Sequence, residues 1–184
     1  MLTRNYWLYK EYADSHPIPW DWTSDSTPDF GVVATDGSTS VVIWTLSQDF
    51  HNAYQLGSEN QRLFVNLDVE LGTGNTAPTV NDYMLYGSLM SHIGNYEQAI
   101  DMHSDGDTLK TTILLSGRNT NVNPITICEI GIFKKFYYSY TAYGDGTQID
   151  TTTKKTLFLR EVLQSPITVA ANDSFVLPFA WVES

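Results

Sequence analysis

The chain has 184 residues, of which 42% are hydrophobic and 17% are charged, and its 21 acidic and 10 basic residues give a formal net charge of −11. This length fits one domain, and the apolar content is sufficient for a packed core. The acidic balance argues against binding to nucleic acid or to an anionic membrane surface, since both require clustered Lys and Arg side chains.

The first segment, residues 1–29, is predicted to be an N-terminal arm ahead of a β-sandwich domain of residues 30–184. Spacing favours a short helix near residues 4–13, and Pro17 and Pro19 predict an extended chain after it. The arm either docks on a neighbouring subunit or folds back over its own sandwich. Its aromatic residues are candidate interface residues, because Tyr and Trp offer large contact areas: Tyr6, Trp7, Tyr9, Tyr12, Trp20 and Trp22.

Strand signals repeat from residue 30 onward. Residues 31–46 contain an Asp-Gly turn between apolar runs and predict a hairpin. Residues 62–71 alternate between apolar and polar side chains, which predicts a strand with one buried face.

A glycine-rich turn follows that strand. We expect Gly72 and Gly74 to use positive φ angles for a tight reversal, and Pro78 to stiffen the exit from the turn. Residues 80–90 then fit a brief helical turn or a lateral excursion.

The second half of the chain contains one weakly patterned stretch followed by clear strand signals. Residues 91–106 are expected to form a solvated polar loop, and their Asp and His residues give only a weak indication of a Ca²⁺ or metal site. Strands are predicted over residues 108–116, 124–138, 156–163, 166–170 and 175–182. Many strands separated by turn signals indicate an all-β antiparallel sandwich or barrel.

Two charged residues interrupt apolar strands. Glu129 shares a strand face with apolar residues, and a buried carboxylate needs a partner. Arg160, on another predicted strand, is the natural candidate, so we predict a Glu129–Arg160 ion pair that fixes register and packing. The single cysteine, Cys128, is expected to be a small buried hydrophobe.

No catalytic signature is legible in this sequence. Histidine ligand spacing such as H-E-x-x-H is missing, as are a Gly-x-Ser-x-Gly elbow and a dinucleotide-binding glycine pattern. We therefore expect no enzyme activity, no cofactor and no metal. Tyr138, Tyr140 and Tyr143 crowd near a Gly-rich loop and are candidate interface residues, since exposed aromatic surface marks contacts.

Four blocks of the chain, read in order, resemble structural proteins of tailed bacteriophages. They are Gly72-Thr73-Gly74-Asn75-Thr76-Ala77-Pro78, then 125–133 (ITICEIGIF), 157–163 (LFLREVL) and 166–169 (PITV). The resemblance covers about residues 63–183. It implies a virion component with a jelly-roll-like sandwich at the capsid surface, neck or tail.

The resulting expectation is a non-enzymatic virion protein, made in the host cytoplasm, that contacts other virion proteins and forms a homo-oligomer. A carbohydrate-binding or receptor-binding sandwich module is the alternative, and a small hydrolase on a sandwich is the third possibility. No apolar signal segment and no run of about 20 apolar residues is present, so we expect neither export by a signal peptide nor a membrane span.

Overall fold

The structure is a computed structural model that describes residues 1–15, 30–37, 39–42, 67–105, 108–141 and 149–183. These residues contain one helix, one short 3-10 turn and eight strands. In chain order they are α1 (Arg4–Ser15), β1 (Phe30–Val33), β2 (Thr39–Val42), β3 (Leu67–Gly72), η1 (Met90–His92), β4 (Ile93–Asp105), β5 (Thr108–Asn119), β6 (Ile125–Thr141), β7 (Ile149–Val169) and β8 (Ser174–Glu183).

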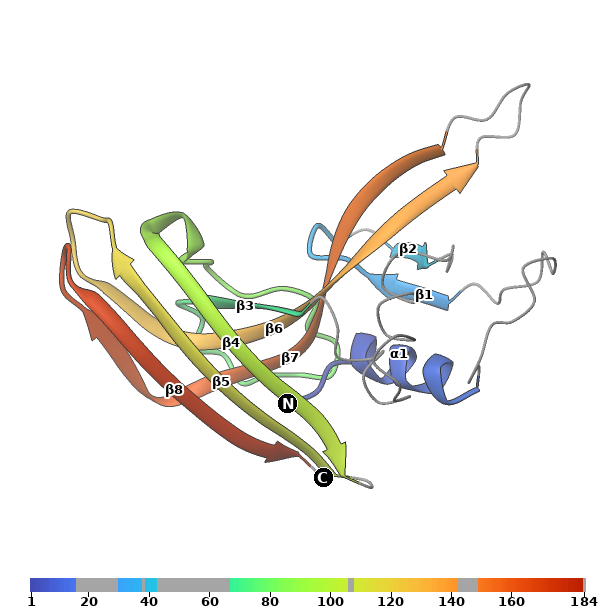
Figure 1. Cartoon of the computed structure of the whole chain (residues 1–184), viewed down its shortest axis with the longest axis horizontal. Helices are drawn as coiled ribbons and strands as arrows, with labels where there is room; N and C mark the ends of the chain where they lie inside the picture. The colour runs from blue at the N-terminus through green and yellow to red at the C-terminus, as the bar shows by residue number, and fades with distance from the viewer. Residues whose placement is uncertain (16–29, 38, 43–66, 106–107, 142–148, 184) are drawn as a thin grey trace.

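Six strands form two antiparallel three-stranded sheets that pack against each other (Figure 1). Sheet I has the strand order β3-β6-β7 and sheet II has the order β4-β5-β8, while β1 and β2 pair separately. Side chains from both sheets form one apolar core, which includes Val69, Ile127, Ile113 and Leu177. The prediction of an all-β antiparallel sandwich is confirmed.

The alternation of side chains explains why these segments form strands. Along β5, buried and exposed residues follow one another almost without interruption, so that Ile113 and Leu115 face the core and Leu114 faces outward. In β3, the described part of the strand predicted over 62–71, Val69 and Leu71 are fully buried. One amphipathic face per strand is therefore sufficient to specify which side packs inward.

The strand β4 corrects the expectation of a polar loop over residues 91–106. It pairs with β5 along most of its length, with a register shift between Gly94 and Glu97. Its alternation is hard to read because it is an edge strand on which Gln98 faces sheet I and Ala99 faces outward. A polar inward residue and a small outward residue remove the contrast on which a period-two pattern depends.

The strand β7 corrects a second expectation, two strands over residues 156–163 and 166–170. It runs unbroken through Pro166, but its pairing to β6 shifts between Ile127 and Glu129. Residues 163–166 therefore lie in an irregular stretch between two regularly paired parts. Proline lacks the N–H that a ladder needs, and an irregularity of this kind accommodates it without ending the strand.

The N-terminal residues 1–15 fold back on their own sandwich, which is one of the two positions that the sequence left open for the arm. Leu2 bridges to Leu159 at the edge of β7, and the Thr3 amide donates to the Phe158 carbonyl at 2.9 Å. The predicted helix is confirmed as α1, whose Tyr6 packs edge-on against Phe158. The extended part predicted after the helix lies outside the described residues.

Candidate functional site

The most distinctive group of side chains is a buried ion cluster of Glu129, Arg160 and Asp82. Arg160 Nε donates to Glu129 Oε2 at 2.6 Å, and Arg160 Nη1 donates to Asp82 Oδ2 at 2.8 Å. Glu129 and Arg160 are fully buried and Asp82 is 7% exposed. The predicted Glu129–Arg160 ion pair is therefore present, and a second carboxylate completes it.

Strand register places the two long side chains together. Gly131 on β6 lies opposite Arg160 on β7, and Glu129 lies two residues before Gly131 on the same face of β6. Gly131 leaves room for the apolar side chains beside the cluster, since a Cβ at this position would lie 2.8 Å from atoms of Leu85 and Phe133. The Arg160 guanidinium reaches the Glu129 carboxylate on the neighbouring strand.

The glycines of the turn have a different role from the one predicted. Positive φ angles occur at Gly37 and Gly87 among the described glycines, so Gly72 and Gly74 do not use that conformation. A Cβ at Gly72 would instead lie 2.5 Å from Glu129 Oε1, and one at Gly74 would lie 2.6 Å from the same atom. These positions need glycine because the chain passes directly over the Glu129 carboxylate, which also accepts a hydrogen bond from the Gly74 amide at 3.0 Å.

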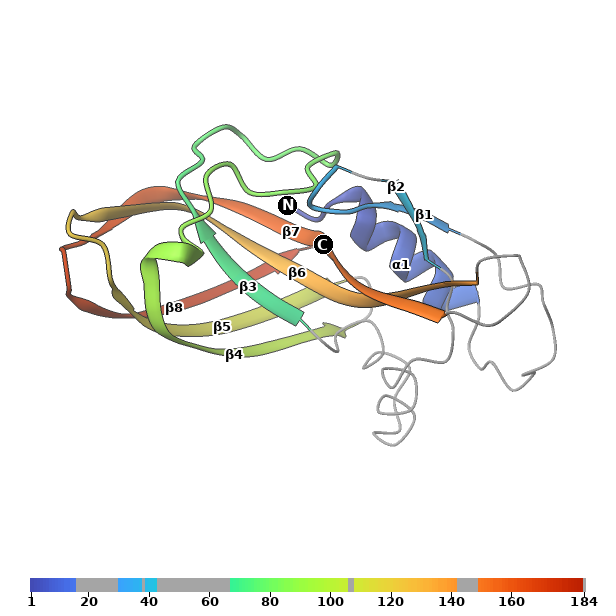
Figure 2. The ribbon, with the colours of Figure 1, turned by 90° about the horizontal axis from the view of Figure 1, so that it is seen from above.

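Residues 73–89, here called the cover loop, lie on the side of sheet I that faces away from sheet II (Figure 2). This is the lateral excursion expected after the turn, and Pro78 lies within it. Leu85 packs on Phe133 and Leu157, and the Tyr86 ring lies 4.7 Å from the Arg160 guanidinium carbon. The ion cluster is thus sealed between the sheet and the loop.

Asp82 joins the cover loop to the cluster. It accepts hydrogen bonds from the Thr79 amide at 3.0 Å and the Thr79 hydroxyl at 2.8 Å, as well as from Arg160. Burial alone would raise the pKa of Asp82, but the hydrogen bonds from Thr79 and Arg160 outweigh it and lower that pKa below its usual value. A carboxyl group with a lowered pKa and occupied oxygens is a weak proton acceptor near neutral pH, so the geometry favours holding the loop over acid–base chemistry.

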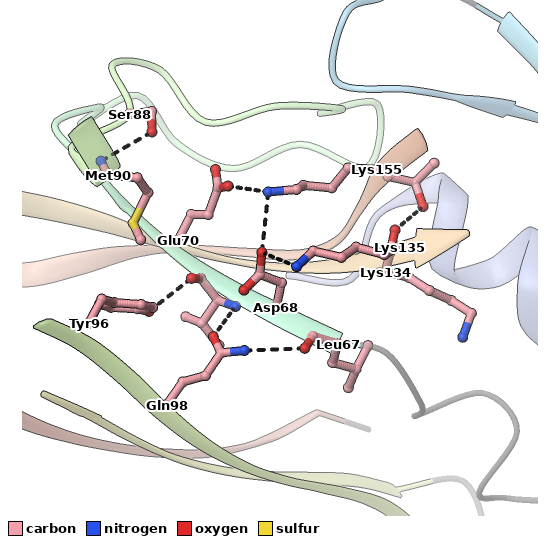
Figure 3. A network of polar contacts seen from close by, with 12 residues as sticks. Leu67, Asp68, Glu70, Ser88, Met90, Tyr96, Gln98, Lys134, Lys135 and Lys155 are labelled. Atoms are coloured by element: carbon pink, nitrogen blue, oxygen red, sulfur yellow. Dashed lines mark hydrogen bonds and ion pairs between the residues drawn. The ribbon is translucent and has the colours of Figure 1, made fainter. Parts of the chain in front are cut away.

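The outer edge of β3 is closed by side chains of β4 (Figure 3). Gln98 accepts from the Val69 amide at 2.8 Å and donates to the Leu67 carbonyl at 3.3 Å. The Tyr96 hydroxyl donates to the Val69 carbonyl at 2.8 Å. These bonds satisfy backbone groups that an edge strand otherwise offers to another chain, and they tie the two sheets together.

The solvent side of β3 carries a network of charged pairs, also visible in Figure 3. Asp68 contacts Lys135 at 3.1 Å and Lys155 at 3.3 Å, and Lys155 also bonds to Glu70. Burial alone would lower the pKa of Lys155, yet the hydrogen bond and the charges of Glu70 and Asp68 raise it. Lys135 and Lys155 therefore form ion pairs within the molecule.

A two-stranded ribbon, defined here as residues 136–141 and 149–154, extends beyond the sandwich (Figure 1). Its strands pair with each other, with Tyr138 opposite Thr152 and Tyr140 opposite Asp150. The ribbon therefore continues the antiparallel pairing of β6 with β7 beyond the sandwich.

The predicted interface residues have different outcomes. Tyr6 is 2% exposed within the core of its own chain, so the proposed contact through Tyr6 is wrong, because Phe158 and its neighbours already cover the ring. Trp7 is 50% exposed and therefore remains a candidate interface residue. Tyr9 and Tyr12 lie on α1, and Tyr138 and Tyr140 lie on β6, whereas Trp20, Trp22 and Tyr143 lie outside the described residues.

Sequence reasoning missed Asp82 and the role of Gln98. Asp82 follows the glycine-rich block in the sequence. An acidic residue followed by apolar residues in a predicted loop was the signal that could have pointed to it. Cys128, expected to be buried, is partly exposed beside the irregular stretch of β7.

Among the residues that the structure describes, no group of three or more His, Cys, Asp or Glu residues is arranged to hold a metal ion. The helix that the structure describes is too short and too polar to cross a membrane. Comparisons of the chain with protein-family models, curated proteins and solved structures found no match.

Proposed function

We propose that this chain is a non-enzymatic structural protein of a tailed-bacteriophage virion, which acts by contacts between protein surfaces. Three of the sequence blocks that resemble such proteins meet at the buried ion cluster. The glycine-rich block passes over Glu129, Glu129 belongs to the second block, and Arg160 belongs to the third. Chance matches scattered along a chain would have no reason to converge on one cluster, so this convergence carries the proposal.

In this proposal, the ion cluster has a structural role. An arginine held between two carboxylates under an aromatic ring fixes a long loop onto a sheet. The Nε and Nη1 groups of Arg160 are engaged in that task, whereas its buried Nη2 group has no hydrogen-bond partner among the described residues. The outward face of β5 and β8, with its exposed Leu114, Val176 and Val182, is a surface that other proteins could contact. A virion component needs such a rigid frame with repeated contacts far more than it needs a reactive centre.

The test is the composition of purified particles. Peptide mass spectrometry of gradient-purified virions, from the virus that encodes this chain, is expected to find it at a fixed ratio to the major shell protein. Washing the particles in high salt should leave that ratio unchanged, while proteins carried over from the lysed host should fall. Particles that are infectious and lack the chain would overturn the proposal.

A carbohydrate-binding or receptor-binding module is a second candidate. The aromatic residues that the sequence concentrates near the end of β6, Phe136, Tyr137, Tyr138 and Tyr140, favour it, because sugars stack on aromatic rings. Binding of the isolated chain to a glycan array, lost when Tyr138 and Tyr140 are both changed to Ser and kept in Val122→Ser at an exposed turn residue, would favour this candidate. Absence of binding to any glycan would leave the structural role as the better account.

A further inference from the structure

The outward face of sheet II is exposed, whereas the cover loop lies on the outward face of sheet I (Figure 2). Leu114 on β5 is 49% exposed, and Val176 and Val182 on β8 are 65% and 64% exposed. Strand pairing places Leu114 beside Pro178, which lies between the two valines along β8. Exposed apolar side chains that gather on one face of a sheet are typical of a contact with another molecule.

Charged residues are distributed unequally over this face. On β4, the side chains of Glu97, Asp101 and His103 are exposed, as charged side chains commonly are on an edge strand. On β8, the other edge strand of the sheet, the outward residues include no charged side chain. They are Ser174, Val176, Pro178, Ala180 and Val182. The β8 side of the face therefore lacks the protection that the β4 side has, and it is the side that we expect a partner to cover.

The face of β8 is better suited to a contact than its edge. Pro178 lies in the middle of β8 and has no N–H to donate, and a proline in an edge strand disfavours the addition of another strand. Between Lys110 and Arg118, the two outward cations of β5, the outward side chains of both strands are uncharged and no larger than leucine. A surface of this kind can pack against another sheet at a distance of about 10 Å.

Two symmetric arrangements of a second copy on this face are disfavoured by charge. A two-fold axis along β5 places Lys110 on Lys110 and Arg118 on Arg118. A two-fold axis across the strands at Leu114 places Lys110 on Arg118, because both lie four residues from Leu114, and it stacks the acidic β4 strands on each other. Like charges that face one another across an interface oppose association, so neither arrangement fits.

A two-fold axis that runs along the strands between β5 and β8 avoids this conflict. It lays β5 of each copy over β8 of the other, so that residues paired within one sheet face each other between the copies. Lys110 then lies over Val182, and its aliphatic stem can cover the valine. Arg118 lies over Ser174. The acids of β4 stay outside the contact, because no strand of the other copy lies above β4.

We infer that two copies of this chain pack face to face through β5 and β8, as an isologous dimer with Leu114 and Val176 at its apolar centre. A second copy is the partner because the face is complementary to itself: its cations lie over uncharged residues and its acids lie beside the contact. This inference deepens the proposed function by naming its partner, and it rests on that function for its biological setting.

The size of the contact sets its strength. Two strands over about nine residues cover about 10 Å by 30 Å. This footprint is smaller than the roughly 800 Å² that each partner contributes to a standard interface. The dimer is therefore weak and forms where the chain is concentrated, as it is inside an assembly.

Sedimentation velocity of the full chain over a wide range of concentration tests the contact. Wild type is expected to form a dimer and no larger species, because an isologous contact closes on itself. Leu114→Lys and Val176→Lys should each raise the apparent dissociation constant by about tenfold or more. Two controls change the net charge equally and should leave the dimer unchanged: Ala99→Lys, on β4 of the same sheet face, and Val122→Lys, in a turn.

Substitutions at Val182 give the sharpest result, because the dimer places this residue over Lys110 of the other copy. Val182→Lys should raise the apparent dissociation constant by about tenfold more than Val182→Glu. General repulsion between acidic chains predicts the reverse order, since the glutamate adds to their net negative charge. Equal effects of the two changes, or a stronger effect of Val182→Glu, would overturn the inference.

The remaining outcomes identify other contacts, and each of them would also overturn the inference. A wild type that stays monomeric at every concentration has no such contact. Species larger than a dimer would indicate a head-to-tail contact. Unchanged dimers of Leu114→Lys would indicate pairing through the edge of β8, and an effect of Ala99→Lys as large as that of Leu114→Lys would place the axis elsewhere on the sheet.

Folding and function can be separated from this outcome. All of the substituted residues are exposed, and unfolding in urea is expected to show unchanged midpoints. A monomeric wild type that is still found at a fixed ratio in purified particles would reject the dimer and leave the proposed function standing. A dimeric chain that is absent from particles would reject the function alone.

Discussion

At the scale of single residues, the ion cluster of Glu129, Arg160 and Asp82 has the largest energetic consequences. Burial removes the hydration of all three groups, and their mutual hydrogen bonds offset that loss only while each partner is present. The cluster is therefore sensitive to the removal of any one charge. It also links three distant parts of the chain, so that a substitution at any one of the three residues is expected to affect the cover loop, β6 and β7.

Removing the charge of Glu129 tests that sensitivity. Glu129→Gln keeps the shape of the side chain but replaces one accepting oxygen by an NH2 donor, which would face either Arg160 Nε or the Gly74 amide in a buried site. We therefore expect a loss of about 1–3 kcal/mol in the free energy of unfolding. Urea unfolding followed by tryptophan fluorescence measures it. Glu97→Gln, the same change at an exposed residue of β4, should alter stability little, and equal effects of the two changes would contradict this account.

The second residue prediction concerns pH. Because the pKa of Asp82 is lowered in the folded chain, its contribution to stability is fully present above its ordinary pKa and is lost as pH falls through the folded value. Wild type should therefore lose more stability than Asp82→Asn between about pH 5 and pH 2. Unfolding free energies measured across this range check the prediction, and parallel pH profiles for the two chains would refute it.

The third residue prediction concerns the close approach of Gly72 to Glu129. Gly72→Ala places a methyl group against the Glu129 carboxylate and should destabilise the chain by about 1–3 kcal/mol. In a chain that already carries Glu129→Ala, that obstacle is gone and the same substitution should cost much less. A double-mutant cycle on unfolding free energies measures the coupling, and additive effects would show that Gly72 is needed for another reason.

At the scale of elements, the joining of the two sheets by β4 side chains is the main feature. Gln98 serves an amide and a carbonyl of β3 at once, which a hydrocarbon of the same length cannot do. Gln98→Leu should lower stability by about 1 kcal/mol and speed hydrogen exchange of the Val69 amide. Glu97→Leu, on the other face of the same strand, should leave that exchange rate unchanged. Slow exchange in both variants would mean that the Val69 amide is protected by something other than Gln98.

The individual elements also show which parts of the fold could be predicted from the sequence. The strands β3, β5 and β8 were predictable because each buries one clear apolar face, and β6 was predictable from its long apolar run. The Glu129–Arg160 pair was predictable because a charge within an apolar strand needs a partner. The strand β4 was missed because Gln98 and Ala99 hide its two faces. The reason for Gly72 and Gly74 was missed because close approach to a side chain 55 or more residues away leaves no local signal.

At the scale of the whole molecule, the net charge of −11 sets the conditions for assembly. Copies that carry the same charge repel one another at low ionic strength. An apolar contact between like-charged molecules responds to salt in a characteristic direction, because salt screens the general repulsion and leaves the buried apolar area in place.

Self-association of wild type should therefore strengthen when NaCl is raised toward physiological ionic strength, where the screening length is about 8 Å. Sedimentation velocity at fixed protein concentration measures the change. An association that weakens as salt is added would show that opposite charges, and not apolar surfaces, hold the copies together.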